Sequence, residues 1–303
     1  LATGSEEPLD FVVPWCERLM QFDEVPLLLK LSKYRLDNDS DPKHRRSNLF
    51  FYSTVLCKAG QYDESLDVIR ELDGLLPDLE VKVHQTMVLH EAGRIDEEIP
   101  ALRQILAIWG ETDYSDLWKR ELVQHTRLAL SSILDRRNSD DEAIELLERI
   151  LDEFPDDPLA LNNLGYLWAC HGENLPRALA MIERAVELDP NNASYQDSLG
   201  WALFKLGRYE EAIAVFEKMN LKAGTGETEQ AVTEVSPEVV RHLAEAYEMA
   251  GREADALREY RSVIQRIDSN TQPENYEDLR AEVSKKIREI ESASSLQETS
   301  VEK

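Results

Sequence analysis

The sequence is poor in the residues that build loops, disulfide frameworks and membrane spans. Gly and Pro number 12 each among 303 residues, too few for a loop-rich β architecture. The three cysteines, Cys16, Cys57 and Cys170, are an odd number at wide spacing, which argues against a disulfide framework. No run of about 18 apolar residues occurs, so we predict no transmembrane helix and no direct insertion into a membrane.

Positive charge is also scarce. The chain has 34 Lys and Arg against 60 Asp and Glu, a formal net charge of −26. Such a chain repels nucleic-acid phosphates and anionic lipid surfaces, so we expect no nucleic-acid partner. A basic or apolar protein or peptide fits the charge better, and the 42% of hydrophobic residues are enough to form a core.

Motifs for catalysis are missing as well. The sequence has no G-x-S-x-G and no G-x-x-x-x-G-K-[ST], and Gly224-Thr225-Gly226 does not follow a predicted strand. No His-x-x-x-His pair occurs among the six histidines. Paired acids such as Asp140-Asp141 are explained more simply as helix N-caps. The sequence therefore predicts no enzyme, no metal site and no cofactor.

What the chain does contain is a repeat with a period of about 34 residues. Asn163-Leu164-Gly165-Tyr166 is followed 35 residues later by Ser198-Leu199-Gly200-Trp201. Ala178 and Ala212 lie 34 residues apart, and the first unit ends in Leu188-Asp189-Pro190. A fixed period of this length is typical of stacked helical units.

These residues resemble the tetratricopeptide repeat, a helix–turn–helix of 34 residues that stacks into a solenoid. Units at 158–192, 193–220 and 237–266 match best, and 124–157 matches more loosely. Upstream, Gly60-Gln61-Tyr62 and Gly93-Arg94-Ile95 suggest divergent units at 46–78 and 79–110. The resemblance implies an all-α fold, an α–α superhelix in the form of a right-handed solenoid of helix pairs.

The residue types explain why the helices of a pair can pack closely. Gly165, Gly200 and Ala244 are small, as are Ala178 and Ala212 on the opposite helices. Glu98 stands where an Ala is expected, and Pro100 follows it, so we expect looser packing there. Pro100 is tolerable if it lies in the first turn of its helix.

The organisation that we predict has a helical array between two disordered ends. The predicted segments are a disordered tail (1–10), a degenerate helix pair (11–45), divergent units (46–123), well-matched units (124–272) with a loop insertion (221–236), a capping helix (273–292) and a disordered tail (293–303). The chain begins at Leu1 rather than Met, which leaves open the cytoplasm or, after removal of a signal peptide, the periplasmic side of a bacterial cell envelope. The sequence motifs around Tyr166 and Trp201, Leu-Gly-Tyr and Asp-Ser-Leu-Gly-Trp, are similar to those of bacterial cell-envelope adaptor proteins.

The resemblance places a partner in a concave groove lined by the first helices of the pairs. Aromatic anchors beside polar groups suit an extended peptide or a helix, although Trp201 and Tyr166 could equally pack against neighbouring repeats. The predicted partner-binding residues are Asn162, Asn163, Tyr166, Asp197, Trp201, Phe204, Lys205, Arg241, His242 and Glu245.

The family includes a carboxylate-clamp subclass that needs Lys and Arg in this groove. The corresponding positions here are Asn162, Tyr166, Ser198, Glu238 and His242, so the clamp cations are missing. We therefore predict a non-enzymatic scaffold or adaptor for a protein or peptide. The alternatives are an accessory region of a larger enzyme or regulator and, with less support, a stand-alone enzyme.

Overall fold

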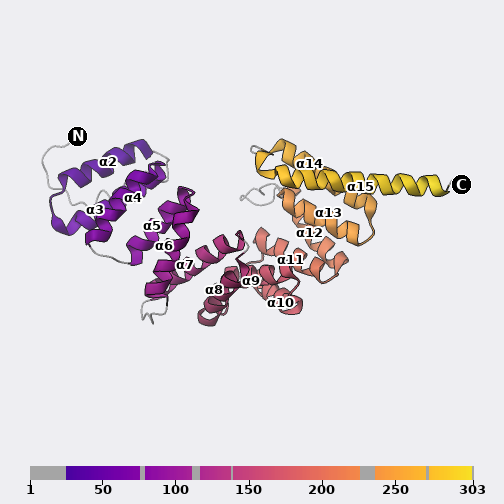
Figure 1. Cartoon of the computed structure of the whole chain (residues 1–303), viewed down its shortest axis with the longest axis horizontal. Coiled ribbons are helices and arrows are strands. Elements are labelled where there is room, and N and C mark those ends of the chain that lie inside the picture. Colours follow the sequence, from indigo (N-terminus) through magenta and orange to yellow (C-terminus); the bar gives the residue numbers. More distant parts are fainter. Residues whose placement is uncertain are drawn as a thin grey trace. The chain divides into compact units, whose positions relative to one another are not determined.

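A computed structural model describes residues 25–75, 79–110, 117–137, 139–225, 236–270 and 273–301. Within these ranges every regular element is a helix, and no strand occurs. The expected tail 1–10 and the first part of the helix pair 11–45 lie outside the described residues. The helices fall into two compact units, residues 1–139 and 140–303, which are described separately below (Figure 1).

Unit 1 contains six described helices, in which α3/α4 and α5/α6 form pairs. Their bounds are α2 (Val25–Asn38), α3 (Pro42–Lys58), α4 (Tyr62–Leu75), α5 (Leu79–Glu91), α6 (Ile95–Trp109) and α7 (Leu117–Asp135).

Unit 2 contains the three best-matched pairs, α9/α10, α11/α12 and α13/α14. The bounds are α8 (Asp140–Glu153), α9 (Pro158–His171), α10 (Leu175–Leu188), α11 (Ala193–Lys205), α12 (Tyr209–Thr225), α13 (Pro237–Met249), α14 (Glu253–Ser269), a 3₁₀ turn η2 (Pro273–Tyr276) and α15 (Glu277–Val301). The division between the units falls inside the expected repeat 124–157, between its two helices.

The first helix of each unit 2 pair begins at a side-chain cap. The carboxylate of Asp157 accepts a hydrogen bond from Ala160 N at 2.7 Å, and the Asn192 side chain accepts from the backbone of Ser194 and Tyr195. These side chains satisfy backbone N–H groups that have no partner within the helix. The sequence thus fixes where α9 and α11 start.

The turn between the helices of a pair ends in a left-handed residue. Gly207 has φ +75°, a conformation that an L-residue with a Cβ adopts only with strain. The turn between α9 and α10 holds one extra residue, because Ala178 lies six residues after Gly172 whereas Ala212 lies five after Gly207, and Asn174 there adopts φ +46°. Asn is among the few other residues that tolerate this region.

Close packing within the unit 2 pairs rests on small residues at two positions. Seven residues before the turn glycine, Gly200 is so close to the opposite helix that a Cβ there would lie 2.5 Å from the Phe216 ring. Five residues after the turn glycine, Ala212 and Ala256 are fully buried. The helices of these pairs approach closely because neither position carries a larger side chain.

Unit 1 fills the same two positions with polar side chains. Ser53 and Thr86 stand seven residues before Gly60 and Gly93, and Ser65 and Glu98 stand five residues after them. All four are buried. Ser53, Ser65 and Thr86 donate to backbone carbonyls.

The expected loose packing around Glu98 is wrong. Its side chain is buried, and its carboxylate lies 3.1 Å from Nδ1 of His90. Pro100 lies in the second turn of α6 rather than the first, yet α6 continues unbroken to Trp109. Pro100 is exposed, so its ring points away from the core.

Two helices run further than the sequence suggests. Helix α12 extends to Thr225, so the first residues of the expected loop 221–236 are helical, and residues 226–235 lie outside the described ranges. Helix α15 extends to Val301 through most of the expected disordered tail 293–303. Both stretches contain Leu and Ala, which favour helix, and no Pro stops either of them.

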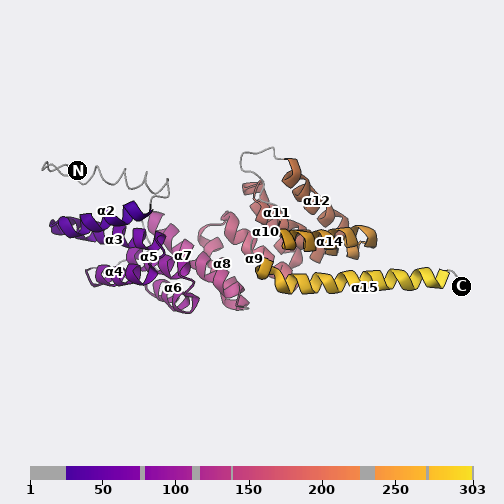
Figure 2. The same cartoon turned by 90° about the horizontal axis from the view of Figure 1, so that it is seen from above.

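Helix α15 packs on α14 and covers the end of unit 2. Val283 and Ile290, seven residues apart, are buried, whereas the polar residues between them are mostly exposed or half-buried. The C-terminal end of α15 projects past the other helices of this unit (Figure 2). This amphipathic arrangement is that of a capping helix.

Neighbouring pairs are also linked by recurrent ion pairs. An acid near the start of a second helix meets an arginine in the next turn: Asp63 with Arg94 at 2.9 Å, Asp96 with Arg137 at 2.7 Å, and Glu210 with Arg252 at 3.7 Å. These side chains are largely exposed, so each pair adds little stability. They mark the same relative position at three contacts between successive helix pairs.

Candidate partner-binding site

The first helices of the unit 2 pairs form one continuous face. Helix α9 contacts α11, and α11 contacts α13, so residues at helical spacing on these three helices lie side by side. We call this surface the first-helix face. Its residues are Asn162, Tyr166 and Cys170 on α9, Asp197, Trp201, Phe204 and Lys205 on α11, and Arg241, Glu245, Glu248 and Met249 on α13.

Trp201 lies at the middle of an aromatic cluster on this face. Its ring stacks on Phe204 at 5.1 Å and contacts the His242 ring at 4.6 Å, while Lys205 Nζ lies 5.4 Å from its centre. The indole Nε1 is buried without a hydrogen-bond partner. Trp201 therefore holds α11 against α13 and leaves only part of its side chain at the surface.

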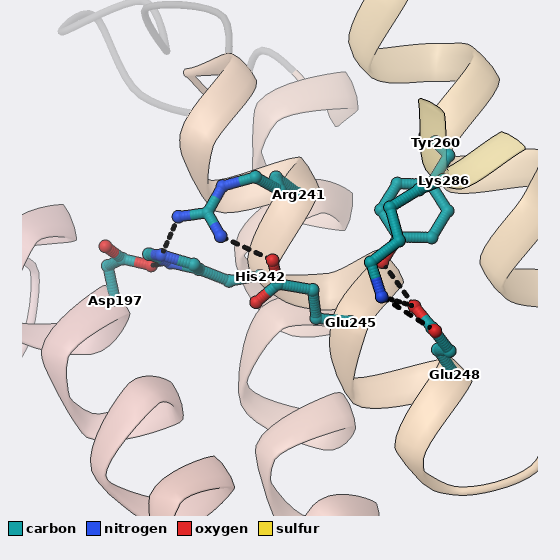
Figure 3. Close-up of polar contacts among 7 residues, drawn as sticks. All are labelled: Asp197, Arg241, His242, Glu245, Glu248, Tyr260 and Lys286. Atoms are coloured by element: carbon teal, nitrogen blue, oxygen red, sulfur yellow. Dashed lines mark hydrogen bonds and ion pairs between the residues drawn. The ribbon is translucent and has the colours of Figure 1, made fainter. Parts of the chain in front are cut away.

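A chain of polar contacts crosses from α11 to α13 at the level of His242 (Figure 3). His242 Nδ1 lies 2.8 Å from Asp197, and its Nε2 lies 2.9 Å from Arg241 Nη2. Because a guanidinium can only donate, Nε2 must accept, which assigns the proton to Nδ1. Arg241 also pairs with Glu245. The charged groups at this end of the face thus satisfy one another.

A second set of contacts joins α13 to α14 and to the capping helix α15. Lys286 of α15 lies 2.9 Å from the Glu248 carboxylate, which also accepts a hydrogen bond from Tyr260 of α14 at 2.7 Å (Figure 3). Burial, together with this carboxylate, raises the pKa of the Tyr260 phenol. Glu248 is therefore fully engaged within unit 2.

Seven of the predicted residues form one connected cluster on α11 and α13, and the other three lie on α9. The cluster comprises Asp197, Trp201, Phe204, Lys205, Arg241, His242 and Glu245. Asn162 donates to Asn163 at 3.3 Å. Tyr166 is half-buried one turn further along α9.

Two of the predicted contact residues are less accessible than expected. Asn162 is 6% exposed and His242 is 5% exposed, so neither offers much surface to a partner. Glu248 and Lys286 are not among the residues that the sequence predicts for the face. Glu248 stands three residues after Glu245, a spacing that could have placed it on the same face. Nothing in the sequence links it to a lysine 38 residues away.

The two ends of the first-helix face differ in character. At the beginning of α11 and α13, the polar groups are bonded to one another. Towards the ends of these helices the face carries Phe204 and Lys205, which are half-buried, and Met249, which is 53% exposed. The second end is the one that leaves apolar surface open.

The described residues give no support to a metal site or to a membrane-spanning helix. Among them, no three His, Cys, Asp or Glu side chains are gathered so that they could hold a metal ion. Within the same ranges, no helix combines the length and the apolar character needed to span a bilayer.

Pairs of antiparallel helices that repeat at a constant spacing, each packed on the next, define an α-helical repeat protein of the solenoid class. The comparisons with known proteins specify the class further. A family model described as tetratricopeptide repeat matches residues 128–193 and 172–224. This region includes two of the three best-matched pairs.

Sequence relatives come from bacteria. A TPR repeat-containing protein of Pseudomonas aeruginosa is 25% identical over 160 residues, which are 52% of this chain and 25% of that protein. Cellulose synthase operon protein C of Pseudomonas fluorescens is 22% identical over 266 residues, 86% of this chain and 17% of that protein. The chain thus spans a quarter or less of the length of these relatives.

A solved structure agrees with the fold. A tetratricopeptide repeat protein from Parabacteroides merdae superposes with a TM-score of 0.61 and 10% identity, and the match covers 91% of this chain and 97% of that one. The likeness at this identity concerns the fold alone. The family match identifies tetratricopeptide repeats at residues 128–224, the family that the residues around Gly165 and Gly200 indicate.

Proposed function

We propose that the protein is a non-catalytic adaptor that binds a protein or peptide partner on the first-helix face of unit 2. Tetratricopeptide repeats imply a protein–protein interaction scaffold. One observation supports this face in particular: half-buried Phe204 and exposed Met249 belong to the same face as Asp197, His242, Arg241 and Glu245, whose polar groups already contact one another.

This arrangement suits recognition because the site is organised before a partner arrives. Trp201 is fixed by Phe204 and His242, and His242 is fixed by Asp197 and Arg241. Rigid aromatic side chains offer contact area at a small cost in conformational entropy. The partner would gain apolar contact with Phe204 and Met249 without breaking the polar contacts behind them.

Capture from a lysate of the source organism, followed by mass spectrometry, tests the proposal. A Phe204→Ala/Met249→Ala variant removes apolar contact area and leaves the contacts of Asp197, His242 and Arg241 in place. Leu188→Ala is the matched control, because Leu188 is an exposed apolar residue of similar size on the second helix α10. We expect the double variant to lose specific partners that wild type and Leu188→Ala retain.

Circular dichroism must show that all three proteins are equally folded. Equal recovery of every partner by the double variant would exclude the first-helix face as the binding surface. It would leave the fold and the family untouched.

A further inference from the structure

The charges on the first-helix face are unevenly matched. Its three carboxylates each have a partner in unit 2: Asp197 with His242, Glu245 with Arg241, and Glu248 with Lys286. Lys205 differs. Among the described residues no carboxylate lies within ion-pair distance of its Nζ, and its recorded contact is with the Trp201 ring at 5.4 Å.

An unpaired lysine at this place is unexpected for a chain with 60 acidic and 34 basic residues. A simple structural explanation exists, since a cation favours both an aromatic face and the last turn of its own helix, where Lys205 lies. Neither interaction satisfies the three N–H donors of an ammonium group. Lys205 therefore retains hydrogen-bonding capacity that the described residues do not use.

The face near the level of Lys205 carries two apolar residues, Phe204 and Met249, together with Glu248, whose carboxylate is already paired with Lys286. Phe204 precedes it in α11. Lys205 lies eight residues beyond Asp197, and Met249 lies seven residues beyond His242, the partner of Asp197. The first helices of successive pairs run in the same direction, and each residue advances about 1.5 Å along a helix. The two side chains therefore stand at about the same level, one turn or more beyond Trp201.

We propose that this end of the face, defined by Phe204, Lys205 and Met249, docks an apolar peptide segment that places one side-chain carboxylate on Lys205. This inference rests on the proposed function and specifies the partner. It also differs from the expectation of a basic partner, which came from the net charge. Net charge acts at long range and is screened beyond about 8 Å in physiological salt, whereas the pairing at contact depends on local groups.

Selection from a random peptide library tests the inference, with the peptides displayed so that their C-terminus is fused to the carrier and no free terminal carboxylate is present. Wild type should select peptides that combine aromatic or aliphatic residues with Asp or Glu. Lys205→Glu should lose that acidic preference and select Lys or Arg instead. The matched control is Lys218→Glu, because Lys218 is an exposed lysine on the second helix α12, and it should select like wild type.

Affinities of one selected peptide, synthesised with an amidated C-terminus, sharpen the result. Lys205→Gln should weaken binding roughly tenfold or more, since a hydrogen bond to a charged group is lost, and Lys205→Arg should restore most of it. Replacing the peptide carboxylate by its amide should have the same effect on wild type and little further effect on Lys205→Gln. Unchanged thermal unfolding of Lys205→Gln separates loss of binding from loss of fold.

The outcomes distinguish the two proposals. Peptides that lose binding in Phe204→Ala/Met249→Ala but show no acidic preference would overturn the role of Lys205 and leave the proposed function standing. Selected peptides that ignore both changes would overturn both proposals. Binding only by peptides with a free C-terminus would overturn the side chain as the source of the carboxylate.

Discussion

Two buried histidines occupy equivalent positions in the two units and have opposite surroundings. His84 and His242 each stand nine residues before the turn glycine of their pair, Gly93 and Gly251. His84 packs against the Phe50 ring at 4.5 Å and meets the Ser53 hydroxyl at 2.6 Å. His242 lies between Asp197 and Arg241. One repeat position thus holds a neutral core residue in unit 1 and the link of a charged network in unit 2.

The positions where the helices of a pair meet show the same contrast. Unit 2 has Gly200 and Ala212 at these positions, and neither has a polar side chain. Unit 1 has Thr86 and Glu98, whose side chains are buried and form polar contacts. The two helices of a pair can therefore pack together either through small residues or through buried polar side chains that have hydrogen-bond partners. The second solution depends on particular partners, which explains why the repeat pattern is weak in unit 1.

The largest expected effect on stability comes from exchanging the residue types of the two units, with a glutamate at position 212 and an alanine at position 98. Ala212→Glu would bury a carboxylate without a cation and should destabilise unit 2 by about 3–5 kcal/mol. Glu98→Ala should change the stability of unit 1 by no more than about 1 kcal/mol, because His90 is more than half exposed and can be solvated. Urea unfolding, with hydrogen exchange to localise the change, measures both.

Ala212→Ser is the control for this exchange, since a serine occupies the equivalent position 65 in unit 1. It should cost less than Ala212→Glu. If Ala212→Glu were as stable as wild type, close packing at this position would not distinguish the units.

The next effect is a dependence of unit 1 on pH. Burial lowers the pKa of His84 from an ordinary 6.5 to about 4, so the unfolded chain binds this proton more tightly than the folded one does. Stability should fall as the pH drops from about 6.5 to about 4, by at most about 3 kcal/mol, and level off below. Denaturant unfolding across this range tests it. His84→Gln should reduce this slope, and a slope of the wild-type size in the variant would contradict the assignment.

A smaller loss should follow from filling the close contact in unit 2. Gly200→Ala places a Cβ 2.5 Å from the Phe216 ring and should cost about 1–3 kcal/mol, because the core must shift to accept it. Adding Phe216→Leu should recover part of the loss. A thermal midpoint that Gly200→Ala leaves unchanged would show that Phe216 moves aside freely.

The smallest effect concerns the ion pairs between neighbouring helix pairs. Asp63→Asn removes the partner of Arg94, but the Asp63 side chain is 94% exposed, and water screens such a pair. Thermal unfolding should shift only slightly at low salt and not at all at high salt. A large shift that survives high salt would mean that Asp63 has a structural role beyond its charge.

The sequence predicts most of unit 2 because its signals are local. A turn glycine, a small residue seven positions before it and an alanine five positions after it are enough to define a pair such as α11/α12. The polar contacts are not local in this sense. His90 contacts Glu98 across a turn, and Glu248 contacts Lys286 of the capping helix α15, so helical spacing does not predict these contacts.

Candidate site residues show the same limit. Helical spacing selects Asn162 and His242 for the first-helix face, but it cannot tell whether a neighbouring helix covers them, and both are buried. Spacing equally selects Lys205, and only the contacts of every other charge show that it lacks an acidic partner. Which face a residue occupies follows from the sequence, whereas its exposure and pairing depend on the packed neighbours.

The turn at Gly207 has one more consequence. Its φ is +75°, and a Cβ built on it would meet nothing within 4 Å. Space is therefore available, and the obstacle to a side chain is the strain of an L-residue at this φ. A D-alanine introduced there by chemical ligation would have the mirror-image backbone preference and should fit. At this turn the backbone conformation restricts the chirality of the residue, whereas the surrounding space does not restrict its size.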